Sequence, residues 1–486
     1  MRIVFAASEC VPFAKTGGLA DAVGALAPEL VKLGHEVTVY LPFYSIVREQ
    51  ASREIKFAAE SITIPFQNYS RFAGIVDGGE LNGVKFYFVD CPELFDRQGI
   101  YGTKSGEYGD NAERFGLFCR AVLEASKLLG VPDIFHVHDW QASLIPVFLR
   151  TVYSSDPMLM NVGVVLTIHN AGYQGWFPPS TTEMLMLPWE VFTYDKLEHY
   201  DTFNFLKGGV VYSDMLTTVS RKYAEEIQTP EFGNQLDGAL RRRSADLRGI
   251  LNGVDYSDWD PATDGNLAAH YTPEDLSGKL ECRDDLLHAF GLQNVAETTP
   301  VIGLVSRFAT QKGFDLLEQI SAKLSERQLA VVALGTGEPF YERFFRDWAY
   351  ENQSLVAVQV KYDEAMAHKV EAGADIFLMP SRYEPGGLNQ IYSLKYGTVP
   401  VVRATGGLDD SIEEWNPKKK TGTGFKFHGY DAQALLDAID RAAVTFQDKS
   451  AWRRLMLNGM AKNFSWEQPS REYVEVYQEV ARRRAG

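Results

Sequence analysis

The stretch from residue 380 to residue 390 holds the side chains best suited to chemistry. It contains a carboxylate, Glu384, followed by Gly386, Gly387 and Leu388. A strand-like apolar run precedes it and a run with helical spacing follows, so the glycine turn gathers backbone N–H groups around one point that suits the phosphates of a nucleotide. Because like charges repel, we expect Glu384 to lie beside the group that the phosphates carry. This arrangement favours a nucleotide sugar.

A second loop offers two cations. Arg307 and Lys312 lie between a predicted strand and a predicted helix. The fork of an arginine and the point charge of a lysine can straddle a diphosphate. Two solvated surface charges are the alternative when this loop is considered alone. The glycine turn at 386–387 shifts the interpretation to a diphosphate site.

A third loop opens the first predicted helix with Lys15 and Gly18, and Asp21 follows one turn later. Glycine permits close backbone approach, and a helix N-terminus favours an anion. The pattern is neither GxGxxG nor GxxxxGK[ST], so the dinucleotide fingerprint and the P-loop are both absent. An ordinary glycine turn with a surface lysine remains the alternative.

Polar side chains end two further predicted strands, with Asp139 after one and His169-Asn170 after the other. These groups suit the hydroxyls of a sugar. Flat apolar faces for the sugar are offered nearby by Trp140, Tyr173 and Trp176, for which core packing is the alternative. His136 and His138 share a strand face, but companions at metal-ligand spacing are missing, so we expect no metal.

The elements that must position these loops alternate between strand and helix patterns in two regions. Such alternation indicates an α/β protein with two doubly wound, Rossmann-like domains, in which ligands bind at the carboxyl ends of the strands. Strands are predicted at residues 2–7, 36–40, 86–89, 134–138, 164–168 and 215–219, and then at 301–305, 329–334, 355–360, 375–379 and 400–402. The less regular pattern of residues 60–110 predicts only short strands and an exposed glycine-rich loop. We place the domains at 1–247 and 248–460, followed by a helix at 461–486.

Composition excludes several classes of protein. The chain has 486 residues, 45% hydrophobic and 23% charged, with a net charge of −16. This acidity argues against a nucleic-acid partner. No run reaches the ~18–20 apolar residues of a membrane span, and the chain opens directly into a strand without a secretory segment. Four cysteines without close pairing predict reduced, buried thiols. We therefore expect a cytoplasmic protein.

Seven motifs together resemble the bacterial glycogen synthase and plant starch synthase family. They occur in order along essentially the whole chain. They are Lys15-Thr16-Gly17-Gly18-Leu19-Ala20-Asp21, His138-Asp139-Trp140, Thr167-Ile168-His169-Asn170, Asn252-Gly253-Val254-Asp255, Ser306-Arg307 with Gln311-Lys312-Gly313, Pro380-Ser381-Arg382 with Glu384-Pro385, and Thr405-Gly406-Gly407-Leu408.

The resemblance implies a GT-B architecture, with the active site in the interdomain cleft and a C-terminal helix that returns to the first domain. It implies transfer of glucose from ADP-glucose to the non-reducing 4-hydroxyl of an α-1,4-glucan, with retention and without a metal or other cofactor. The first domain would hold the acceptor and the second the donor.

The resemblance also implies the roles of the site residues. Arg307 and Lys312 would neutralise the diphosphate, and His169 and Asp139 would hold the glucose, with Glu384 by its anomeric region. The remaining donor contacts would come from Lys15, Gly18, Asp21, Asn252, Tyr362 (stacked on the base), Gly386, Gly387 and Leu388.

The chain departs from the family pattern at two places, and two alternative functions remain open. Many bacterial members carry Cys and Thr where this chain has Gly386 and Asn389. Tyr392 stands where the broader retaining pattern has a second glutamate, which glycogen and starch synthases also lack.

The alternative functions are those of a transferase that uses UDP-glucose and of a catalytically weak glucan-binding protein. The phosphate-binding cations argue against the second alternative. The sequence does not indicate an oligomeric state.

Overall fold

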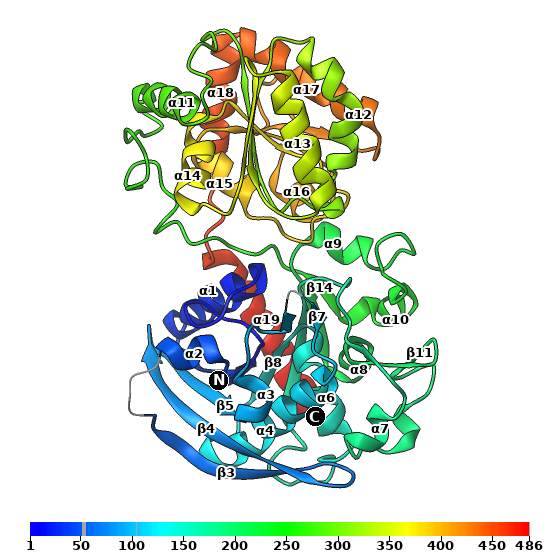
Figure 1. Cartoon of the computed structure of the whole chain (residues 1–486). Helices are drawn as coiled ribbons and strands as arrows, with labels where there is room; N and C mark the ends of the chain where they lie inside the picture. Colours follow the sequence, from blue (N-terminus) through cyan, green and yellow to red (C-terminus); the bar gives the residue numbers. More distant parts are fainter. Residues whose placement is uncertain (51–54, 104, 486) are drawn as a thin grey trace. The chain divides into compact units, whose positions relative to one another are not determined.

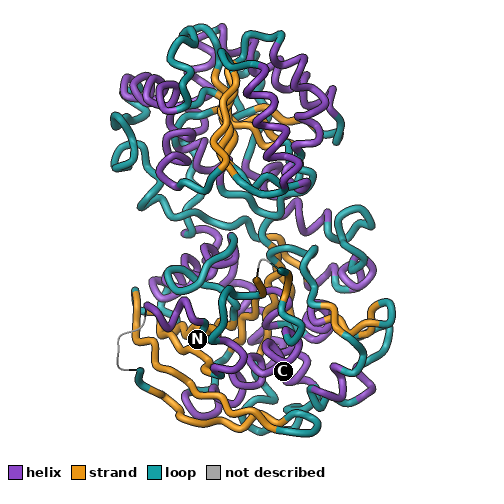
Figure 2. The backbone as a smooth tube through the Cα atoms, viewed as in Figure 1, coloured by secondary structure: helices purple, strands orange, loops and turns teal. Residues whose placement is uncertain are grey.

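The computed structural model describes residues 1–50, 55–103 and 105–485, and the chain divides into two compact units. Unit 1 comprises residues 1–253 together with the segment that starts at Trp466, and unit 2 spans Val254–Ser465. Figure 2 shows that each unit is a sheet covered by helices. The divisions fall six and five residues beyond the predicted 247 and 460, because the last strand of the first sheet ends at Gly249 and Gly253 packs against Trp466.

Unit 1 is built on a nine-stranded sheet in the order β14-β13-β9-β8-β1-β2-β5-β4-β3. The seven strands from β14 to β5 run parallel. Their bounds are β1 (Arg2–Ala6), β2 (Glu36–Pro42), β5 (Val84–Asp90), β8 (Ile134–His138), β9 (Gly163–Ile168), β13 (Met215–Thr218) and β14 (Leu247–Gly249). Near-continuous apolar runs are typical of strands buried on both faces, and β8 and β9 are buried at every residue.

An antiparallel extension corrects the prediction for residues 60–110. There, β3 (Phe57–Pro65) pairs with the twelve-residue β4 (Ser70–Leu81), which pairs with β5. Glycines inside β4 concealed it, because glycine weakens the strand signal. These glycines leave room for aromatic rings of the neighbouring strands. A Cβ at Gly78 would meet the ring of Phe88, and one at Gly74 would meet the ring of Phe57.

Three long helices pack on this sheet, two of them on its parallel strands and one, α4 (Asn111–Leu129), mainly on β3. Helix α1 (Gly18–Lys32) is the crossover between β1 and β2, α4 precedes β8, and α19 (Glu467–Ala485) contacts β8, β9 and α1 (Figure 1). The smaller elements of unit 1 are α2 (Ser45–Gln50), α3 (Pro92–Phe95), β6 (Gly102–Thr103), β7 (Gly106–Glu107), α5 (Asp139–Ala142), α6 (Leu144–Arg150), β10 (Trp176–Phe177), α7 (Thr181–Met184), η1 (Trp189–Val191), β11 (Glu198–His199), β12 (Thr202–Asn204), α8 (Phe205–Tyr212), α9 (Arg221–Glu226), α10 (Asp237–Arg242) and η2 (Ser244–Asp246).

Unit 2 has a six-stranded, fully parallel sheet in the order β17-β16-β15-β18-β19-β20. Its strands are β15 (Val301–Val305), β16 (Ala330–Gly335), β17 (Val356–Val360), β18 (Ile376–Met379), β19 (Val399–Arg403) and β20 (Phe425–Phe427). Its helices are α11 (Ser277–Ala289), η3 (Thr310–Lys312), α12 (Phe314–Ser325), α13 (Pro339–Glu351), α14 (Glu364–Gly373), α15 (Asn389–Lys395), α16 (Gly406–Ser411), α17 (Ala432–Gln447) and α18 (Lys449–Met460).

The two Rossmann-like sheets confirm the predicted fold class. Every strand predicted in the second region is present, with ends that differ by at most one residue. All four cysteines are buried and unpaired. None of the helices within the described ranges combines the length and apolar character needed to cross a bilayer.

Candidate functional site

The predicted site residues of unit 1 follow the carboxyl ends of adjacent strands. Strand β8 lies between β1 and β9, with Ala6 paired to Val137 and His138 paired to Thr167. The loop after β1 leads to Gly18, while Asp139 and His169 directly follow β8 and β9. The three loops therefore share one edge of the sheet, where ligands bind in such folds.

Glu9 shapes the glycine loop and was missed by the sequence analysis. Its carboxylate accepts hydrogen bonds from the Thr16 hydroxyl at 2.7 Å, from the Gly17 N–H at 3.2 Å, and from the Thr16 N–H and the Tyr101 hydroxyl. The Glu9 side chain is buried. A buried carboxylate that receives several N–H and O–H groups holds the loop in one conformation. Only its position just beyond a strand end could have indicated this role.

Lys15 and Asp21 form an ion pair across the first turn of α1, with Nζ and Oδ1 2.7 Å apart. Both side chains are partly exposed, so the pair stabilises the fold little and both groups remain accessible. A Cβ built at Gly18 meets no atom within 4 Å. The described residues therefore do not require glycine at position 18 for packing, and the space is open to a ligand.

Asp139 and His169 contact each other directly. The Asp139 Oδ1 atom accepts the backbone N–H of His169 at 2.7 Å. Burial raises the pKa of Asp139 to about 7, helped by the nearby Glu9 charge and opposed by N–H groups that hydrogen-bond to its carboxylate. Burial also lowers the pKa of His169 to about 3, so its ring is neutral at physiological pH. Asp139 has a φ of 53°, and such strain in a non-glycine residue concentrates at functional sites.

The three aromatic side chains suggested for the sugar separate into two groups. Trp140 is a core residue, because its ring is buried against Phe115, Phe177 and Phe205. The core-packing alternative is therefore correct for this tryptophan. Tyr173 and Trp176 are 53% and 50% exposed and remain available to a ligand.

Asn252 lies after β14, at the end of the same sheet. The backbone N–H of Asn252 donates to Val219 O at 3.3 Å, and the residue as a whole is 9% exposed. Its side-chain oxygen is buried without a hydrogen-bond partner among the described residues. Such an atom costs about 1–3 kcal/mol unless it is satisfied, so it is available as an acceptor for a ligand group.

The predicted residues of unit 2 lie in loops at the carboxyl edge of the second sheet, where β15 and β18 are neighbours. Lys312 ends η3, in the loop after β15, and Glu384 lies in the loop after β18. The Lys312 Nζ atom is 2.7 Å from Glu384 Oε2, which also accepts the Ser381 hydroxyl at 3.0 Å. The geometry thus brings a cation suited to phosphate beside the carboxylate assigned to the sugar.

Close backbone contacts hold the glycine turn at 386–387 in place. A Cβ at Gly406 would overlap the carbonyl oxygen of Glu384, and one at Gly407 would overlap that of Gly386. The buried Gln390 amide donates to the carbonyls of Gly386 and Gly387 at 3.2 and 3.1 Å. The sequence analysis missed Gln390, since a glutamine on a helix carries no local signal of such a contact.

Arg307, Tyr362 and Leu388 complete the set in unit 2. Arg307 is exposed after β15, and Leu388 is half-buried at the start of α15. Tyr362 follows β17 and is 82% exposed, so its ring is open to a stacking partner. Asn389 donates its side-chain N–H to Val305 O at 3.0 Å and thereby links the turn to β15.

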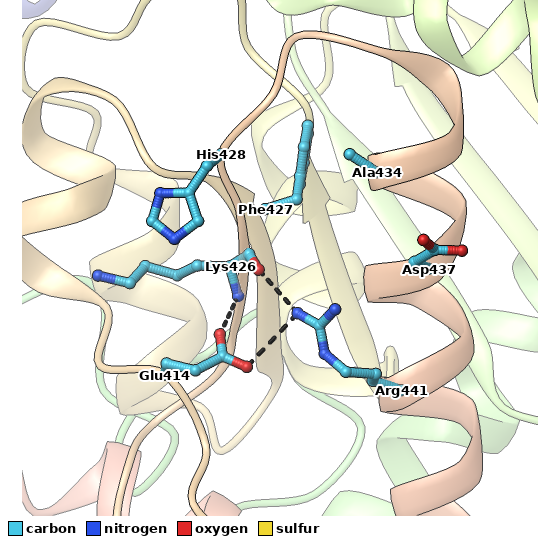
Figure 3. Close-up of a pocket in the computed structure, with 7 residues that line it drawn as sticks. All are labelled: Glu414, Lys426, Phe427, His428, Ala434, Asp437 and Arg441. Carbon is cyan, nitrogen blue, oxygen red and sulfur yellow. Dashed lines mark hydrogen bonds and ion pairs between the residues drawn. The ribbon is translucent and has the colours of Figure 1, made fainter.

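Two other features lie apart from the predicted site. Among the described ranges, no group of three His, Cys, Asp or Glu side chains is arranged to hold a metal ion. A hollow of about 360 Å³ on unit 2 shares no residue with the predicted site (Figure 3). There Arg441 donates to Glu414 at 3.4 Å and to Lys426 O at 2.7 Å, and Lys426 Nζ lies 2.7 Å from Asp409, so both cations are already paired with carboxylates of unit 2.

Comparisons with known families match both regions of the chain. Residues 2–242 match the starch synthase catalytic domain, and residues 291–444 match the glycosyl transferases of group 1. The chain is 56% identical over 485 residues to a glycogen synthase of Koribacter versatilis, covering 100% of this chain and 99% of the relative. It is 45% identical over 489 residues to a glycogen synthase of Thermotoga maritima, covering 99% of each.

Solved structures agree with these relatives. The catalytic domain of starch synthase IV from Arabidopsis thaliana, bound to ADP and acarbose, matches with a TM-score of 0.88 and 32% identity, covering 99% of both chains. Sucrose-phosphate synthase from Thermosynechococcus elongatus matches with a TM-score of 0.60 at 18% identity, covering 99% of this chain and 98% of that one. This second likeness concerns the fold alone.

Proposed function

This chain belongs to the glycogen and starch synthase family of glycosyltransferases, and from that premise we propose that it is a glycogen synthase. It transfers glucose from ADP-glucose to the 4-hydroxyl at the non-reducing end of an α-1,4-glucan, with retention of configuration. The observation that carries this proposal within the structure is the 2.7 Å contact between Lys312 and Glu384. A phosphate-binding cation next to a sugar-binding carboxylate is the pairing that a sugar diphosphate requires.

Unit 2 binds the donor in this proposal. Departure of a nucleoside diphosphate develops negative charge, which fixed cations stabilise most in a site without water. Arg307 and Lys312 supply that charge, and the turn at 386–388 supplies backbone N–H groups. Tyr362 stacks on the base, and Glu384 lies by the anomeric carbon of the glucose. The exposed ring of Tyr362 and the paired ammonium of Lys312 support these assignments.

Unit 1 binds the transferred glucose and the acceptor glucan. The neutral ring of His169 and the carboxyl of Asp139 are suited to sugar hydroxyls, and the open space at Gly18 suits an anion at the start of α1. Lys15, Asp21 and Asn252 complete the donor contacts. The buried, unpaired cysteines support a cytoplasmic location.

Initial rates of labelled glucose incorporation into glycogen, from ADP-glucose and UDP-glucose in parallel, test this function. We expect a strong preference for ADP-glucose and a loss of at least a hundredfold in Glu384→Gln. Glu326→Gln, which changes an exposed carboxylate of the same unit, serves as the matched control and keeps the wild-type rate. The anomeric configuration of the new linkage is read by NMR and should be α.

The other outcomes identify the alternative functions. Transfer from UDP-glucose alone keeps the fold and the reaction class but replaces the donor. Binding of glycogen without transfer from either donor supports a glucan-binding protein and rejects the proposed activity. Equal rates for Glu384→Gln and Glu326→Gln would remove Glu384 from the reaction.

A further inference from the structure

Three histidine rings form a row beneath the edge of the sheet in unit 1. His136 and His138 project from the same face of β8, with ring centroids 4.2 Å apart. His169 follows β9, whose Thr167 is paired with His138, so His169 is the diagonal neighbour of His138. The Nδ1 atom of His138 lies 3.1 Å from Nε2 of His169. The site histidine is therefore hydrogen-bonded to a second imidazole behind it.

All three rings are neutral, because burial lowers the pKa of each. The pKa of His169 is about 3, and those of His136 and His138 also lie well below the ordinary value. A neutral imidazole carries one N–H and one bare nitrogen. The hydrogen bond between His138 and His169 therefore contains one proton, which belongs to one ring or to the other.

The second nitrogen of His138 decides between these two arrangements. Its Nε2 atom is buried and has no hydrogen-bond partner among the residues that the structure describes, and the residue is 1% exposed. A buried N–H without an acceptor is rarer and more costly in proteins than an acceptor left without a donor. The proton of His138 is therefore disfavoured on Nε2 and favoured on Nδ1, where His169 accepts it.

We propose that His138 is a positioning residue that donates its Nδ1–H to Nε2 of His169 and so fixes the tautomer of His169. With Nε2 of His169 occupied as an acceptor, the single proton of that ring resides on Nδ1. His169 then presents an N–H donor and is not a general base. This inference deepens the proposed function and rests on it, since the group that accepts this N–H is a hydroxyl of the transferred glucose.

The surroundings of His136 keep His138 in this orientation. His136 Nε2 lies 2.6 Å from the Thr167 hydroxyl, and His136 Nδ1 lies 2.8 Å from the hydroxyl of Tyr477 on α19. Both nitrogens are thus engaged and the ring cannot turn without losing a hydrogen bond. The ring of Phe5 packs against His136 at 4.6 Å and against His138 at 5.2 Å. These contacts leave His138 little freedom to rotate.

Two-bond ¹H–¹⁵N correlation spectra of the full chain, labelled with ¹⁵N-histidine, report the tautomers without any need for turnover. Comparison with His169→Asn and His138→Asn assigns the two spin systems. We expect both rings to show the Nδ1–H pattern. An Nε2–H pattern at His169 in the wild-type protein overturns the proposal, whatever the activity. A wild-type chain with the expected tautomers but no transfer refutes the proposed function and not the tautomer assignment.

Variants of His138 link the tautomer to turnover. An asparagine places an N–H near the original Nδ1, so His138→Asn should stay within about threefold of the wild-type kcat. His138→Leu removes the donor, and we expect a mixed tautomer at His169 and a kcat at least tenfold lower, with KM for ADP-glucose changed less than twofold. Val480→Ala, which truncates a buried apolar side chain of α19, controls for lost stability. Equal losses of kcat in His138→Leu and Val480→Ala, without a tautomer change, overturn the positioning role.

Discussion

The ammonium of Lys312 lies 2.7 Å from the carboxylate of Glu384, a residue 72 positions further along the chain. The contact joins the loop after β15 to the loop after β18, and both side chains are largely buried, at 19% and 8% exposure. One atom pair therefore links the predicted phosphate loop to the predicted sugar carboxylate. It also stabilises the edge of the second sheet.

Removal of the Lys312 ammonium should weaken both the fold and the reaction. Lys312→Ala leaves a buried, unpaired carboxylate, which costs about 3 kcal/mol of unfolding free energy. In the double variant with Glu384→Gln, most of the lost unfolding free energy should be recovered. The rate of glucose transfer should remain at least a hundredfold below that of the wild type. Denaturant unfolding and initial rates of the two single variants and the double variant measure these effects. Lys323→Ala, at an exposed position of α12, is the control. Additive stability losses would contradict a direct pair.

Gly313 should be far less tolerant of substitution than Gly291. Both have positive φ, 75° and 73°, so the backbone strain of an alanine lowers the unfolding free energy by a similar amount, about 1 kcal/mol, at either site. A Cβ at Gly313 would overlap the carbonyl oxygen of Pro380, whereas one at Gly291 meets nothing within 4 Å. We expect Gly313→Ala to lower the unfolding free energy by about 3 kcal/mol or more. Equal thermal midpoints for the two variants would show that the loops after β15 and β18 are not in close contact.

Tyr362 should affect the donor and not the fold. Its ring is 82% exposed, so Tyr362→Ala should leave the unfolding midpoint unchanged. Stacking of a base on an aromatic ring is worth about 1–3 kcal/mol, so we expect KM for ADP-glucose to rise about tenfold. Tyr350→Ala removes a tyrosine of similar exposure, 77%, from the same unit and serves as the matched control. A normal KM in Tyr362→Ala would exclude the base contact.

Unit 1 should lose stability as the pH falls below 6.5. His136, His138 and His169 have lowered pKa values in the fold, so the unfolded chain binds protons there that the folded chain does not. Each contributes up to about 1.4 kcal/mol per pH unit. Asp139 has the opposite sign, because its raised pKa of about 7 makes the folded chain bind a proton that the unfolded chain has lost.

Thermal unfolding between pH 5.5 and 6.5 measures this balance. Among these four groups the three histidines outweigh Asp139, so together they lower the midpoint as the pH falls. Asp139→Asn removes the opposing contribution. The slope of unfolding free energy against pH should therefore become steeper by the equivalent of about one bound proton. Asparagine also tolerates the positive φ of this position, which makes it the appropriate substitution. A slope that is unchanged in Asp139→Asn would show that this carboxyl titrates normally in the fold.

Local patterns were sufficient for most of the parallel strands of the two sheets and for the loops that carry the site. The apolar runs at 134–138 and 301–305 are strands with the predicted bounds. Apolar periodicity reports which face of a segment is buried, and glycine and charge mark the turns between segments. The same local character explains why β4 was missed, because its glycines are accommodated by aromatic rings of other strands.

By itself, the sequence determined the family, the alternation of strands and helices, and the strand ends that carry the site. Only the tertiary structure decided how distant residues support that site. Glu9 holds the loop at Thr16, Gln390 anchors the turn at 386–387, and Tyr477 reaches His136 across 341 residues. Each contact joins side chains whose neighbours in sequence carry no sign of it. The physical reason is that hydrogen-bond partners of buried polar groups are chosen by packing in three dimensions, whereas secondary structure is favoured by residues only a few positions apart.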